Sequence, residues 1–92
     1  MWVNDVNDRN AVLLAIQEFD RDRHKFLATY GFHEARKYFL EHEDKLYDCK
    51  PILWAAFVHL FPGRASQTHA SNGVNKFVKP QLQKLGFQVR VL

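Results

Sequence analysis

Cysteine is nearly absent from this sequence, and its scarcity excludes two kinds of stabilising site. The chain has 92 residues and one cysteine, Cys49, so it can form no internal disulfide. Its five histidines stand nine or more residues apart, so no closely spaced pair is available to bind zinc. We therefore expect no bound metal and no cofactor, and a reducing, cytoplasmic setting.

Long hydrophobic runs are also missing. Residues 1–5 show neither the basic nor the apolar region of a signal peptide, and no apolar run approaches the roughly 20 residues that span a membrane. We therefore expect neither secretion nor membrane insertion. A hydrophobic content of 47%, with 14% aromatic residues, predicts instead that residues 1–92 form one compact domain with its own core.

Acidic residues are absent from the second half of the chain. All ten Asp and Glu lie in residues 1–48, whereas residues 49–92 carry six lysines and arginines and no carboxylate. The positive field of such a surface attracts polyanions, and nucleic acid is the commonest polyanion that a cytoplasmic domain meets. A solvated basic face beside an acidic half is the alternative, and charge alone does not choose between the two.

Residues 47–59 contain an apolar run that predicts a buried central helix. Asp48 stands at its N-cap and Pro51 in its first turn, where a missing N–H group costs nothing. The helix is apolar on most faces, which is typical of a buried helix, and Pro62 ends it. His59 shares a face with Ile52, so we expect a core histidine rather than a catalytic one.

Two helices are predicted before this central one. Val12, Ile16 and Phe19 form one apolar stripe, with Asn7 or Asp8 available as the cap of the first helix. Asp22 then caps a short second helix that ends at Gly31. One continuous helix over residues 9–30 is the competing interpretation.

A hairpin and a final strand supply the predicted sheet. Residues 38–40 and 46–47 flank the tight polar segment 42–45, which indicates a hairpin even without a glycine in its turn. Residues 87–91 alternate apolar and polar side chains, as a half-buried strand does.

The last predicted helix covers about residues 74–85, with Ser71 or Asn72 as its cap and Gly86 just beyond its end. Pro80 conflicts with a regular helix. Either it kinks the helix, or a looser first segment gives way to a helix that begins nearer Phe77. The predicted order is therefore α-α-β-β-α-α-β, an α+β fold with a small, largely antiparallel, three-stranded sheet packed on helices.

Residues 62–73 are small and polar, without apolar periodicity, and predict a long loop. Loops of this length in compact domains are usually functional or disordered. Its side chains donate hydrogen bonds and include no carboxylate, a composition that suits phosphates and base edges. The candidate DNA contacts in this loop are Arg64, Ser66, Gln67, Thr68, His69, Ser71 and Asn72.

Three lysines extend this candidate surface. Lys50 lies near the N-terminus of the buried helix, where unpaired N–H groups and a positive charge together suit a phosphate. Simple exposure, or pairing with Asp48, is the alternative for Lys50. Lys76 and Lys79 continue the candidate surface, whereas we expect Lys84 and Arg90 to be solvated.

No set of residues for catalysis is evident. The helix N-terminus and Lys50 could lower the pKa of Cys49, yet no His or Asn is placed by the sequence to complete a nucleophilic set. We therefore expect Cys49 to be a small residue at the helix entry. Trp2 and Trp54 are better explained by packing than by stacking on bases.

Three groups of residues resemble a known family. They are Tyr30-Gly31-Phe32 with Ala35-Arg36 and Tyr38-Phe39-Leu40; Tyr47-Asp48-Cys49-Lys50 with Ile52, Ala55, Ala56 and His59; and Asn72-Gly73 with Leu85-Gly86-Phe87-Gln88-Val89. In this order and spacing they look like the N-terminal head domain of McrA-type modification-dependent HNH restriction endonucleases, over roughly residues 14–90. The chain departs from that pattern at Cys49, where a serine is expected, and at Pro51 and Pro80.

The resemblance implies a role in DNA recognition. In that family the head domain precedes DNA-reading modules and a separate HNH nuclease domain, which lies outside these 92 residues. We therefore expect a DNA-binding module that is not itself an enzyme, with modified DNA as a candidate target and a nuclease domain or subunit as a candidate partner. The alternative is a docking domain whose basic half meets an acidic protein partner.

Overall fold

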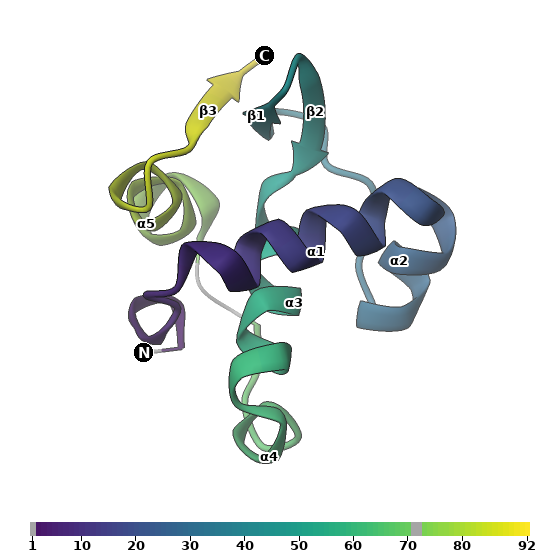
Figure 1. The fold of residues 1–92 in the computed structure, drawn as a ribbon, viewed down its shortest axis with the longest axis vertical. Coiled ribbons are helices and arrows are strands. Elements are labelled where there is room, and N and C mark those ends of the chain that lie inside the picture. Colours follow the sequence, from purple (N-terminus) through teal and green to yellow (C-terminus); the bar gives the residue numbers. More distant parts are fainter. Residues whose placement is uncertain (1, 71–72) are drawn as a thin grey trace.

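Helix α3 (Cys49–Leu60) runs through the middle of the structure, a computed structural model that describes residues 2–70 and 73–92 (Figure 1). Its residues from Pro51 to Phe57 are all buried, as the apolar run predicts. Helix α1 (Arg9–Arg21) crosses α3 and packs against it, burying the stripe of Val12, Ile16 and Phe19. A helix that is apolar on most faces thus becomes the element on which the other helices pack.

The predicted break after α1 is confirmed, and the continuous helix is excluded. Asp8 caps α1 by accepting a hydrogen bond from the Asn10 N–H at 2.9 Å. Helix α2 (Arg23–Tyr30) begins after Asp22, whose carboxylate accepts from the Lys25 N–H at 3.1 Å. Helix α2 ends at Gly31, which has a φ of 77°, a conformation that glycine adopts without strain.

The three strands form the predicted antiparallel sheet, so the α+β fold class is confirmed. Strand β1 (Tyr38–His42) lies between β2 (Lys45–Asp48) and β3 (Gln88–Val91). Leu40 of β1 pairs with Tyr47 on one side and with Val89 on the other. Leu40 and Tyr47 are buried, which places their face of the sheet toward the helices.

The hairpin turn forms without glycine. Glu43 and Asp44, its two central residues, have φ values of 49° and 64°. A two-residue hairpin turn of this kind requires positive φ at both positions, because only then does the turn match the twist of the strands. Aspartate tolerates this region better than glutamate does.

Two short helical turns were not predicted. One is η1 (Val3–Asp5), which packs on α3. The other is α4 (Pro62–Ala65), which follows α3 in the chain. The prediction of a loop over residues 62–73 is therefore wrong for its first four residues. Proline is well placed at the first position of a helix because its fixed φ is already helical and its missing N–H would be unpaired there.

Pro80 is accommodated by a change of helix type. One turn of π-helix, η2 (Val74–Val78), precedes helix α5 (Lys79–Lys84), and the Val78 N–H donates to the Gly73 carbonyl five residues back at 3.3 Å. The looser-segment interpretation is thus the closer one, although α5 begins at Lys79 rather than nearer Phe77. The predicted caps Ser71 and Asn72 lie outside the described residues. Gly86 follows α5 with a φ of 89°.

The core joins the N-terminus to α3 and α5. Trp2 packs edge-on against Trp54, with ring centroids 5.1 Å apart, so both tryptophans are packing residues. The buried Gln81 amide donates to the Val6 carbonyl at 2.8 Å and thereby ties α5 to the start of the chain. Among the described residues, none of the helices is both long and apolar enough to cross a membrane.

Candidate nucleic-acid interface

The structure places the predicted DNA contacts in three regions: the entry of α3, the segment beyond its other end, and the junction of η2 and α5. Lys50 is the second residue of α3, whereas Arg64 lies in α4, beyond the other end of α3. A helix of 12 residues is roughly 18 Å long at 1.5 Å per residue, so the two side chains do not share one phosphate. We call residues 62–70 the α4 segment and treat Lys76 and Lys79, on η2 and α5, separately.

Arg64 is fixed in place by three other residues. Its Nη2 atom donates to the Asp5 carboxylate at 2.6 Å. Its guanidinium lies over the rings of Phe61 and Phe57, at 5.0 and 5.4 Å from their centroids. The side chain is nevertheless 54% exposed, so part of its donor fork remains open to solvent.

The remaining donors of the α4 segment fall into two groups. The Ser66 hydroxyl donates to the Gly63 carbonyl at 3.1 Å, and the Thr68 hydroxyl donates to the Arg64 carbonyl at 2.7 Å. These two side chains stabilise the end of α4 and have no proton left to give to a phosphate. Gln67 and His69 are exposed, and neither makes a side-chain hydrogen bond within the described part of the chain.

The basic residues of the second half differ in their pairing. Arg64 pairs with Asp5, and Arg90, predicted to be solvated, pairs with Glu41 at 2.9 Å. The four lysines of this half, Lys50, Lys76, Lys79 and Lys84, have no carboxylate oxygen within 4.0 Å among residues 2–70 and 73–92, and the same is true of the three lysines of the first half. Lys76 and Lys84 are exposed, and Lys50 and Lys79 are half-buried.

Lys50 emerges from a partly buried position. Burial lowers the pKa of its ammonium, because the charged form loses part of its hydration. The alternative in which Lys50 pairs with Asp48 is excluded, since the Asp48 carboxylate binds Arg23 instead. Lys50 therefore keeps a charge without a partner at the entry of α3, as far as the described residues go.

Asp48 occupies the predicted N-cap position of α3, but its side chain does not cap the helix. Its side chain accepts no hydrogen bond from the first turn of the helix. It accepts instead from Arg23 Nε at 3.0 Å, from Arg23 Nη2 at 3.1 Å and from the Ala35 N–H at 2.6 Å. Asp48, one residue of the family pattern, thus joins α2 and the segment before β1 to the entry of α3, which is a structural role.

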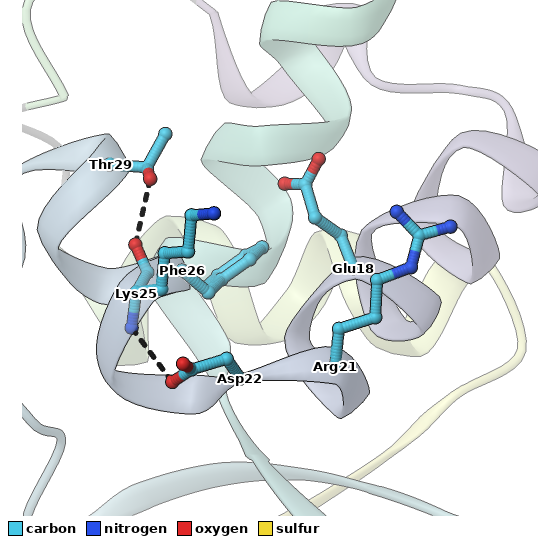
Figure 2. A pocket seen from close by; sticks show the side chains of 6 residues that line it. All are labelled: Glu18, Arg21, Asp22, Lys25, Phe26 and Thr29. Carbon is cyan, nitrogen blue, oxygen red and sulfur yellow. Dashed lines mark hydrogen bonds between the residues drawn. The ribbon is translucent and has the colours of Figure 1, made fainter.

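The hollows of the surface do not coincide with the predicted contacts. One hollow, of about 220 Å³, lies between α1 and α2. Figure 2 shows the side chains that line it, among them Glu18, Lys25 and Phe26. A second, of about 330 Å³, lies between α1 and the hairpin and includes Arg9, Asp20 and Tyr47. None of the eight predicted DNA contacts that the structure describes lines either hollow, and the other two, Ser71 and Asn72, lie outside the described residues.

The geometry of His59 corrects another prediction. The side chain is exposed rather than in the core, and its Nε2 atom lies 3.5 Å from a carboxylate oxygen of Glu18. Glu18 also accepts a hydrogen bond from the Tyr30 hydroxyl at 2.5 Å, and burial, followed by this bond, raises the pKa of Tyr30. Residues 58–60 in the last turn of α3 are half-buried or exposed, whereas residues 51–57 are buried, so the buried part of the helix ends before His59.

Cys49 is buried at the helix entry, as expected. Burial and the Asp48 carboxylate raise its pKa to about 12, which is the opposite of nucleophile activation. Within the described residues, no three His, Cys, Asp or Glu side chains come together in a way that could hold a metal ion.

These observations define a small α+β domain with unpaired lysines on its second half. The family model described as "ScoMcrA-like, N-terminal head domain" matches residues 4–91, and the chain belongs to this family. A solved structure, that of the Type IV phosphorothioation-dependent restriction endonuclease ScoMcrA, is similar at 34% sequence identity with a TM-score of 0.60. The match covers 92% of this chain and 13% of that chain. No curated protein matches the sequence.

Proposed function

We propose that this head domain is a DNA-binding module that works beside a nuclease domain and carries out no catalysis itself. The single observation that carries the proposal is the distribution of charge: the four lysines on α3, η2 and α5 lie in a half of the sequence without Asp or Glu, and none has a carboxylate within 4.0 Å in the described structure. A lysine that already has an acidic partner gives little net attraction to a phosphate, whereas an unpaired one releases a counterion when it binds.

Lys76 and Lys79 are the pair best placed to act together. They stand three residues apart across the junction of η2 and α5, a spacing that puts side chains close together on a helical surface. Lys76 is exposed, and residues 49–92 contain no Asp or Glu side chain that would repel a phosphate. These two side chains would position DNA without reading its sequence.

Reading of the DNA is assigned to the α4 segment. Gln67 and His69 are exposed and keep their side-chain donors and acceptors available, whereas Ser66 and Thr68 have used their protons. ScoMcrA is described as phosphorothioation-dependent, and we propose that modified DNA is also the target of the protein to which this head domain belongs.

The test is a binding titration at two salt concentrations with the same duplex unmodified, carrying methylated cytosine, and carrying backbone phosphorothioate. Changing Lys76 and Lys79 to glutamine should weaken binding to all three probes alike and reduce the slope of log affinity against log salt by about two. Lys45→Gln, an exposed lysine of the hairpin, is the matched control and should leave the slope unchanged.

The outcomes separate the parts of the proposal. A preference of tenfold or more for one modified probe, about 1.4 kcal/mol, would make the domain a modification reader, and loss of that preference in Gln67→Ala would place the reading in the α4 segment. Equal, weak binding to all probes would leave only an electrostatic anchor. Absence of binding even at low salt would refute DNA binding and favour docking of the basic half on an acidic partner.

A further inference from the structure

The ion pair between Asp5 and Arg64 joins an acidic residue of the first half to the one arginine of the α4 segment. Their atoms Oδ2 and Nη2 lie 2.6 Å apart, although the residues are 59 positions apart in the sequence. Asp5 ends the short turn η1, which packs on α3. The carboxylate therefore occupies one donor of a side chain that the sequence predicts as a DNA contact and that lies in the segment to which the proposed function assigns the reading of DNA.

The segment that carries Asp5 is firmly held. Trp2 is 4% exposed and packs against the rings of Trp54 and Phe57, and Val3 and Val6 are fully buried. Asp5 thus reaches Arg64 from an anchored backbone, so the pair does not depend on a freely moving terminus. A carboxylate fixed in this way is present whenever the domain is folded.

Arg64 does not need Asp5 to keep its position. Its guanidinium rests on the faces of Phe57 and Phe61, at 5.4 and 5.0 Å, and its backbone belongs to α4. Such stacking leaves the donors at the rim of the guanidinium plane available for a phosphate. Loss of the carboxylate would therefore free a donor and remove a negative charge without releasing the side chain.

We propose that Asp5 attenuates the affinity of the α4 segment for DNA, an inference that rests on the proposed function. A phosphate that binds Arg64 either displaces the carboxylate or comes to lie beside it, and like charges at such short range repel each other. The pair is half-exposed, so the effect is a modest one that salt screens. The arrangement would keep non-specific binding weak and leave tight binding to DNA that makes further contacts.

The variant Asp5→Asn tests this proposal in the same titration. We expect it to bind duplex DNA about 3- to 10-fold more tightly than the wild type at low salt, with a smaller gain at high salt. Asp44→Asn is the matched control: it also removes one negative charge, asparagine tolerates the positive φ of the turn, and the hairpin lies at the other end of the molecule from α4 (Figure 1). Asp5→Ser serves as a second variant, should the amide of asparagine restore the hydrogen bond.

A double-mutant comparison shows whether the gain passes through Arg64. In an Arg64→Ala background, Asp5→Asn should give no gain beyond that of Asp44→Asn. If both Asp5 variants bind like Asp44→Asn, or more weakly than the wild type, Asp5 does not attenuate binding and the proposal is overturned. If no protein binds DNA at any salt concentration, the proposed function fails first, a result distinct from wild-type binding that Asp5 does not affect.

Discussion

Asp48, which is 1% exposed, receives two hydrogen bonds from the fork of Arg23, 25 residues earlier in the chain. A third comes from the Ala35 N–H at 2.6 Å. The carboxylate thereby joins α2, the segment before β1 and the entry of α3. Hydrogen bonding to Asp48 outweighs burial and raises the pKa of Arg23, as expected for a charge-assisted, forked pair.

Replacing this carboxylate should weaken the fold markedly. In Asp48→Asn the amide keeps the size of the side chain but loses the charge, leaving Arg23 without its buried partner. Because Arg23 is itself 37% exposed and recovers some hydration, we expect a loss of about 2–3 kcal/mol, less than breaking a fully buried pair costs. Urea unfolding measures it. Asp22→Asn, an exposed neighbour that still caps α2, should change stability by less than about 0.5 kcal/mol.

A substitution in the hairpin turn should stabilise the domain instead. Glu43 and Asp44 both hold positive φ values, 49° and 64°, which L residues other than asparagine and aspartate rarely adopt. Changing the pair to Asn-Gly should stabilise the domain by about 1 kcal/mol, since these residues fit the turn without strain. Thermal unfolding should show a higher Tm. An unchanged or lower Tm would mean that Glu43 makes a compensating interaction in the native state.

Much of the fold could be predicted because its signals are local. Asp8 and Asp22 lie directly before the helices they cap, and Gly31 lies directly after one, so the pattern of neighbouring residues is sufficient. The buried helix α3 shows itself in the same way, through an apolar run between a cap position and Pro62. The alternation of residues 87–91 likewise predicts β3. Its pairing with β1, which is distant in the sequence, does not follow from this local pattern.

The features that could not be predicted depend on partners that are distant in the sequence. Asp48 stands at a position typical of a helix cap, yet its carboxylate binds the guanidinium of Arg23, 25 positions away, and not the N–H groups of the helix N-terminus. Arg64 stands in a segment without carboxylates, and only the fold brings Asp5 to it. Pro80 predicts a looser segment before α5, but not that this segment is a turn of π-helix packed against α3.

Gln81 illustrates a buried polar contact that only the structure reveals, and it supports a further prediction. Its amide donates to the Val6 carbonyl at 2.8 Å across 75 residues. Gln81→Met preserves length and volume but leaves that buried carbonyl without this donor, so we expect a loss of about 1–2 kcal/mol. Gln83→Met, two positions along on the exposed side of α5, is the control and should be nearly neutral in urea unfolding. Equal stability of the two variants would show that water replaces the lost donor.

The raised pKa of Cys49 predicts how stability changes in alkaline solution. The unfolded thiol loses its proton near pH 9, whereas the folded thiol holds it to about pH 12. Between these values the native state binds more protons than the unfolded state, so the free energy of unfolding falls as pH rises, by up to about 1.4 kcal/mol per pH unit. The ordinary pKa of tyrosine is 10.0, and that of Tyr47 is raised to about 12, so its contribution begins above pH 10. Between pH 9 and 10, the free energy of unfolding of Cys49→Ala should therefore fall less steeply with pH than that of the wild type. Lys50 is present in both proteins, so its titration does not affect the difference between them. If the two proteins lose stability in parallel over that interval, the thiol is not protected by burial.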